Sequence, residues 1–169
     1  LFETSKDVVF FCDTECQFAD INQAGVDLFG YKSKNEILKL NLVQHVFFSP
    51  VEGKAIKEMV CKNGFIKDYE VELKKEDGIR VPCLMTSNLR RDERNNIIGY
   101  EGIIIDLTER KKIEQEKDIM NNINKILASN LDIRKVYKSF SEELNKVVEF
   151  DHMSITLLDE KRDELLIFA

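Results

Sequence analysis

Apolar and polar residues alternate with a period of two along the middle of the chain. In "YEVELKKEDGIRVPCLMTSNL" (69–89) the alternation runs on both sides of Asp77-Gly78, a pair that favours a tight hairpin turn. A third run, "IIGYEGIIIDL" (97–107), is apolar on both faces, so we expect its outer face to be covered as well. The three runs predict an antiparallel meander of three strands.

Another hairpin and several short helices are predicted before this meander. "DVVFFCDTECQFADIN" (7–22) has two apolar runs on either side of a polar Asp-Thr-Glu turn, which is typical of a hairpin. Apolar residues then recur at helical spacing within 22–37, where Gly30 is the expected helix stop, and again at about 51–62.

The chain passes from the last strand of the meander to a helix with no loop between them. Ile103–Ile105 indicate a buried strand, and the residues that follow are charged and helix-forming. Asp106 and Glu109 have the spacing of a capping box, so a carboxylate can end the strand and start the helix at once. We interpret Asp106, Thr108 and Glu109 as a signal relay that fastens a sheet to an output helix.

The helix expected at 109–128 has an apolar stripe with heptad-like spacing. Ile113, Met120 and Leu127 recur every seven residues, and Ile123 fills an intermediate position. About two to three such heptads favour a coiled coil between two copies of the chain. The alternative is an amphipathic helix that lies on its own domain.

The last segment, 129–169, has the pattern of a helix followed by a hairpin. Its helix is indicated by Val136, Phe140, Leu144 and Val147. "MSITLLDEKRDELLIFA" (153–169) then reads as strand, charged turn and strand. A hairpin and one helix are too little for independent stability, so we expect this segment to be the beginning of a larger domain.

Two passages resemble the PAS domain family over about residues 1–110. "INQAGVDLFGYKSKNEI" (21–37) is similar to the family's second strand and first helix, and "IIGYEGIIIDLTERKKIE" (97–114) to its last strand and Asp-x-Thr exit. The matching residues are Asn22, Ala24, Leu28, Gly30, Tyr31, Gly99, Gly102, Asp106 and Thr108. Cys16 departs from the family, because glycine is common at that place in the hairpin turn. The resemblance implies an α+β fold with a PAS-like antiparallel five-stranded sheet flanked by short helices, forming a sensor domain at 1–108.

The segment "SNLDIRKVYKSFSEELNKVVEFDHMSITLLDEKRDELLIF" (129–168) resembles the opening helix and first two strands of a GAF domain. A PAS–helix–GAF order is typical of sensor histidine kinases and relatives of nucleotide cyclases. The resemblance implies a sensor and dimerisation module, with a homodimer through the linker helix and a downstream signalling domain in the same chain.

Composition narrows the choice of partners and location. The formal net charge is −6 and the sequence pI about 5.1, which argues against a nucleic-acid surface. No apolar run approaches the roughly 20 residues that cross a bilayer, so no membrane insertion is expected. The four irregularly spaced cysteines indicate reduced thiols in a cytoplasmic protein and no metal site.

No set of residues has the pattern of a catalytic site. The two histidines, His45 and His152, lie in different predicted domains, and no phosphate-binding loop or metal-binding helix motif occurs. This fragment is therefore not expected to be an enzyme, although the parent protein could be a histidine kinase or a nucleotide cyclase.

The alternation of side chains along the predicted strands, together with the apolar pattern, predicts a set of residues that face the core or line a pocket. They are Phe10, Phe29, Phe65, Tyr69, Val71, Cys83, Met85 and Tyr100. A small-molecule ligand is possible among them, and a filled core is the alternative, since the chain has eleven phenylalanines.

No cofactor is expected. Haem would need an axial ligand, for which His45 is the PAS-region candidate, so a haem-based redox or gas sensor is one alternative function. A ligand-free dimerisation scaffold is the other.

Overall fold

The computed structural model describes residues 2–128, 133–150, 152, 154–159 and 164–168. The chain divides into two compact units, Leu1–Glu109 and Arg110–Ala169, and each is described here by itself.

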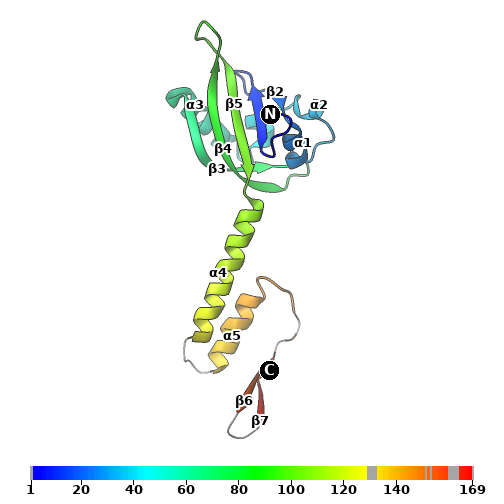
Figure 1. Ribbon diagram of the computed structural model, residues 1–169, viewed down its shortest axis with the longest axis vertical. Helices are drawn as coiled ribbons and strands as arrows, with labels where there is room; N and C mark the ends of the chain where they lie inside the picture. Colours follow the sequence, from blue (N-terminus) through cyan, green and yellow to red (C-terminus); the bar gives the residue numbers. More distant parts are fainter. Residues whose placement is uncertain (1, 129–132, 151, 153, 160–163, 169) are drawn as a thin grey trace. The chain divides into compact units, whose positions relative to one another are not determined.

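The first unit is built on a five-stranded antiparallel sheet, as the sequence predicts (Figure 1). Its strands are β1 (Val8–Cys12), β2 (Phe18–Ile21), β3 (Phe65–Lys74), β4 (Arg80–Arg91) and β5 (Ile97–Asp106), in the order β2-β1-β5-β4-β3. The first hairpin and the later meander join where β1 pairs with β5, with Phe10 opposite Gly102. This crossover puts β5 in the centre of the sheet, although it is the last of these five strands in the sequence.

Short helices connect the two halves of the sheet and cover one of its faces. They are α1 (Gln23–Phe29), α2 (Lys34–Ile37), the π-helix η1 (Leu42–Val46) and α3 (Pro50–Asn63). Local chemistry sets their ends: Asn22, Asn41 and Ser49 cap the starts of α1, η1 and α3 with side-chain oxygens, and Gly30 and Gly64 end α1 and α3 with positive φ. The core between helices and sheet is centred on Phe10, Phe29, Phe47, Met85 and Ile104, each at most 1% exposed.

Phe65 and Tyr69 do not belong to that core, so their prediction as core or pocket wall is wrong. Phe65 is 54% exposed and Tyr69 39% exposed, whereas Ile66 is buried. The reason is a register shift between Ile66 and Tyr69, where Asp68 adopts a φ of 49°. The extra residue reverses the side-chain alternation before it, and β3 is an edge strand, so Tyr69 beside the bulge stays half-open.

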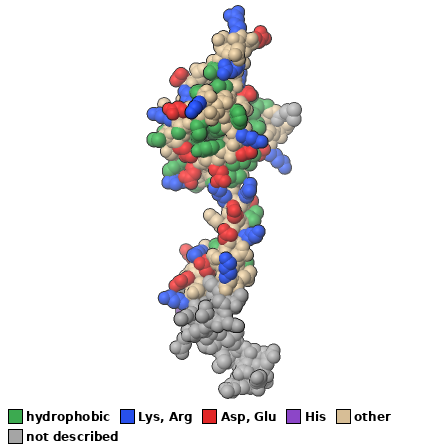
Figure 2. Space-filling model, turned by 90° about the vertical axis from the view of Figure 1, so that its left-hand side faces the viewer, with side chains coloured by type: hydrophobic (Ala, Val, Ile, Leu, Met, Phe, Trp, Pro, Cys, Tyr) green, Lys and Arg blue, Asp and Glu red, His purple; other side chains and the backbone are tan. Residues whose placement is uncertain are grey.

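The outer face of β5 also differs from expectation. Ile103 and Ile105 are 43% and 38% exposed, so in the described part of this chain the outer face of the sheet is open. The helices of the first unit pack on one face only. Figure 2 shows acidic and basic side chains interspersed on the visible side of this unit, with apolar side chains between them.

The long helix α4 (Thr108–Ala128) follows β5, and α5 (Ile133–Leu144) and the antiparallel hairpin of β6 (Ile155–Asp159) and β7 (Glu164–Phe168) come after it. The helix-and-hairpin pattern is thus present, while the GAF identity of 129–169 and the three-part division at 108 and 128 stay predictions. No helix in the described ranges is long and apolar enough to cross a membrane.

The apolar stripe of α4 is not uniformly available to a second chain. Ile113 and Met120 are 56% and 57% exposed, as a dimer seam requires, but Ile123 is 6% exposed and already covered within this chain. Packing inside the chain covers Ile123 in this arrangement, and the seam of Ile113, Met120, Ile123 and Leu127 stays a prediction. The side chain of Leu127 lies outside the described residues.

Candidate functional site

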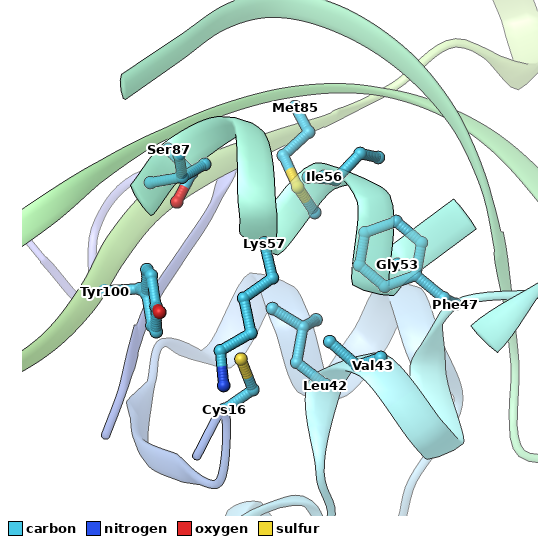
Figure 3. Close-up of a pocket in the computed structure, with 11 residues that line it drawn as sticks. Cys16, Leu42, Val43, Phe47, Gly53, Ile56, Lys57, Met85, Ser87 and Tyr100 are labelled. Atoms are coloured by element: carbon cyan, nitrogen blue, oxygen red, sulfur yellow. The ribbon is translucent and has the colours of Figure 1, made fainter. Parts of the chain in front are cut away.

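A small cavity lies between α3, η1 and the sheet (Figure 3). Its lining residues are Cys16, Leu42, Val43, Phe47, Gly53, Ile56, Lys57, Val60, Met85, Ser87 and Tyr100. Its volume is about 20 Å³, which is room for about one water molecule or one small apolar group. At this cavity the core of the first unit is thus nearly filled.

The structure brings together only two of the nominated pocket residues at this cavity. Met85 and Tyr100 line it, from β4 and β5. Phe10, Phe29, Val71 and Cys83 are buried elsewhere in the core. Sequence parity selects strand residues that face inward, but it does not say which of them meet a gap in the packing.

Lys57 is the charged residue of the cavity wall, and strand parity could not find it because it lies on a helix. It stands on α3, four residues after Gly53 and three before Val60, so the 3.6-residue period places all three on one face. That spacing was the available signal. The same lysine also borders a shallow outer depression, whose other residues are Lys54, Glu58, Cys61 and Lys62. Lys57 therefore stands at the mouth of the cavity.

The polar groups at this mouth are arranged around Tyr100. The Lys57 ammonium lies 5.9 Å from the centre of the Tyr100 ring, and the Tyr100 hydroxyl lies 3.1 Å from Cys61 Sγ. Burial is the main cause that raises the pKa of the Tyr100 hydroxyl, and its bond with Cys61 raises that pKa further. Tyr100 is therefore a neutral hydrogen-bonding group at neutral pH.

Cys16 reaches the cavity from the turn between β1 and β2. It adopts a φ of 67°, the left-handed conformation that glycine would take most easily. The Asp13 carboxylate fixes this turn by accepting backbone bonds of 2.9 Å from Glu15 and Gln17. Cys16 thus holds a left-handed conformation that is strained for a residue with a side chain, and it adds a thiol to the cavity wall.

The cysteines differ in their chemical state. Burial raises the pKa of Cys16 to about 11, against a lowering by Lys57, and burial raises the pKa of Cys83 to about 12. Burial likewise raises the pKa of Cys12, while Cys61 is exposed. The thiolate is the reactive form of cysteine. The three buried thiols are therefore protected because a reagent cannot reach them and because their raised pKa keeps them protonated.

A thiol-specific disulfide reagent at about pH 8 should therefore modify one thiol per native chain quickly. Unfolding in denaturant should release all four cysteines. The variant C61S, assayed in the same way, should lose the fast phase. Fast reaction of two or more thiols in the native protein would contradict this burial pattern.

His45 does not suit the role of a haem ligand. It is exposed on η1, outside the cavity lining, and its Nδ1 accepts a 3.0 Å bond from the backbone N–H of Asn41. The cavity is also far below the roughly 300–1,000 Å³ of common cofactor pockets. The residues present do not fit haem. No group of three or more His, Cys, Asp or Glu side chains with metal-binding geometry occurs among the described residues.

The predicted relay joins the sheet and α4 through a single residue. Leu107 stands between β5 and α4, is 6% exposed, and donates its N–H to Pro82 O at 2.9 Å. The Asp106 carboxylate accepts a 2.7 Å bond from the backbone N–H of Thr108. A capping box would use the N–H of Glu109, three residues on, so Asp106 acts one position earlier than the spacing suggests. Glu109 lies in the first turn, where the helix dipole favours a carboxylate.

Comparison with known proteins supports the architecture described above. A family model for the PAS domain matches residues 6–109. The PAS domain of a Colwellia psychrerythraea protein is similar in structure, with a TM-score of 0.57, 20% identity, and 64% of this chain and 92% of that one covered.

Two further solved structures share the fold. A PAS domain from a two-component sensor histidine kinase gives a TM-score of 0.52 at 15% identity, covering 62% of this chain and 87% of that one. A PAS domain of a LuxR-family transcriptional regulator from Burkholderia thailandensis, in complex with ethanol, also gives 0.52 at 15% identity, covering 63% and 94%. No curated protein matches this chain in sequence.

Proposed function

The chain belongs to the PAS domain family, a family of signal-sensing modules, and from this membership we propose that it is the regulatory sensor and dimerisation module of a signal-transduction protein, with a sensor histidine kinase as the favoured parent. One observation carries the proposal: β5 passes into α4 across Leu107 alone, with Asp106 bonded to the first turn of the helix.

The proposed relay runs along β5. Tyr100 borders the cavity and Asp106 ends the same strand six residues later. β5 is held on both sides by β1 and β4, so a shift at Tyr100 is transmitted along a braced strand. A ligand or partner drives such a shift only if it binds two arrangements of the domain with different affinity. The two arrangements would differ in the direction that the hinge gives to α4.

The remaining parts of the proposal concern the assembly. Exposed Ile113 and Met120 support pairing of α4 with a second copy, and the segment 129–169 would pass the signal to a downstream domain of the same chain. A cytoplasmic location, no enzymatic activity in this fragment and no nucleic-acid partner complete the proposal. The small cavity gives specific support to one second candidate, a dimerisation scaffold that works without a ligand.

Substitution of Asp106 by alanine tests the relay. D106A removes the acceptor for the Thr108 N–H and should cost about 0.5–2 kcal/mol of stability. In hydrogen exchange, the first turn of α4 should exchange faster while β5 stays protected. In the full-length protein, the response to its stimulus should be lost or strongly reduced.

Two variants serve as controls for this experiment. D106N keeps an oxygen that can accept the Thr108 bond and should retain most of the response. D118A removes a carboxylate from the exposed surface of the same helix and should behave like the native protein. If D106A melts at a lower temperature but responds normally, Asp106 only stabilises the joint and the relay is wrong.

A further inference from the structure

We propose that the cavity and its mouth bind a short-chain carboxylate, with the carboxylate group at Lys57 and a tail of one or two carbons inside. This inference rests on the proposed sensor function and names the ligand class for that site. It is carried by the pairing of a small apolar cavity with a cation that has no carboxylate partner among the described residues.

The interior of the cavity offers almost no polar group to a ligand. Six apolar side chains dominate the wall: Leu42, Val43, Phe47, Ile56, Val60 and Met85. The Ser87 hydroxyl is already used, since it donates to Glu101 O at 3.1 Å. A volume of about 20 Å³ accepts a methyl or ethyl group after slight adjustment, but not a ring or a long chain.

Lys57 supplies the charge at the opening. In the part of the chain that the structure describes, no carboxylate lies within 4 Å of its ammonium, and its recorded neighbours are the Tyr100 ring and the Cys16 thiol. Figure 3 shows the Lys57 side chain running along the cavity with its nitrogen beside Cys16. A half-buried cation attracts an anion more strongly than a fully exposed cation does, because water screens the pair only in part.

Two features at the opening suit a carboxylate in particular. When the Cys61 thiol donates to the Tyr100 hydroxyl, that hydroxyl is left free to donate to an anion at Lys57. The outer depression carries Lys54, Lys57 and Lys62 against Glu58, so an anion is attracted there although the whole chain is acidic. An alcohol would fill the cavity without using the charge, and phosphate would use the charge without filling the cavity.

The test is a titration of the chain with sodium acetate, propionate, butyrate and hexanoate at constant ionic strength, followed by amide NMR shifts. We expect saturable binding, strongest for acetate or propionate, with shifts at residues of α3 and at Tyr100. K57M should weaken propionate binding by about tenfold or more. K57R keeps the charge and should retain most of the affinity, and K67M, which removes an exposed charge on β3, should bind as the native chain does.

Three outcomes would overturn the inference. Sodium chloride could give the same shifts, K54M could cost as much as K57M, or 1-propanol could bind equally tightly with the same dependence on Lys57. The first two would mean that anions in general are attracted to α3. The third would mean that the negative charge of the ligand does not contribute to its affinity. Binding is measured on the chain itself, so a chain that binds no carboxylate would not contradict the Asp106 relay. A D106A variant that responds normally would likewise not contradict the binding result.

Discussion

Replacement of Gly99 by alanine should destabilise the first unit by about 3 kcal/mol or more. Gly99 has a φ of +147°, and a Cβ built on it would lie 2.0 Å from Cys12 O and 3.0 Å from Asp13 Cα. Both neighbours are backbone atoms at the end of β1, so no side chain can turn away to make room. Because β5 is the central strand, any retreat would open its pairing with β1.

Two other glycines separate the two causes of this effect. Gly78 has a φ of +84° with open space around it, so G78A should cost only the left-handed conformation, about 1 kcal/mol. A Cβ at Gly102 would meet Thr86 O at 2.5 Å without a positive φ, so G102A measures the clash alone. Denaturant unfolding of the chain should rank the losses as G99A, then G102A, then G78A. Equal losses for G99A and G78A would show that the sheet yields at no cost.

The sheet could be predicted from the sequence because its signals are local. Alternation along 69–89 and the Asp77-Gly78 turn determine which residues pair, and neither depends on distant parts of the chain. The single error of parity arose at the Asp68 bulge, which adds one residue to β3 and has no signature in the alternation itself. The joint at Asp106 could be located for the same reason. Its hydrogen bond, however, reaches the N–H two residues on, at Thr108, and not the N–H three residues on that a capping box uses.

The cavity could not be predicted in the same way. Its wall combines the turn residue Cys16, two residues of a π-helix, Phe47 just after that helix, four residues of α3 including Lys57, and three of the sheet. A gap between elements depends on how tightly they close on each other, and the period of one element contains no such information. The burial of Ile123 is a similar case, since heptad spacing indicates a stripe but does not identify what covers it.

Asn22 is the other position where one substitution should have a large effect. It is fully buried and uses its whole hydrogen-bonding capacity. Its Oδ1 accepts from the N–H groups of Val9 and Gly25 at 3.0 and 3.3 Å, and its Nδ2 donates to Phe2 O and Asp7 O at 3.1 and 2.9 Å. One side chain thus caps α1 and holds both the start of β1 and the segment before it.

N22A should lower the free energy of unfolding by about 2–4 kcal/mol, because several buried backbone groups lose their partner together. N22D keeps the shape but turns an oxygen toward the Phe2 and Asp7 carbonyls, where only a donor is tolerated. Burial and these carbonyls should raise the folded-state pKa of the new carboxyl above its unfolded value of about 3.9. The folded state then binds the proton more tightly, so the stability that the protonated form confers is present below about pH 4 and is lost as pH rises.

The deficit of N22D relative to the native chain should therefore grow from about pH 4 to pH 7, whereas that of N22A should stay constant with pH. Denaturant unfolding at several pH values measures both. As a control, D27N changes an exposed residue of the same helix in the opposite chemical sense and should leave the stability nearly unchanged. A pH-independent deficit in N22D would mean that the two carbonyls move away from the new oxygen, and that Asn22 fills space more than it organises the first hairpin.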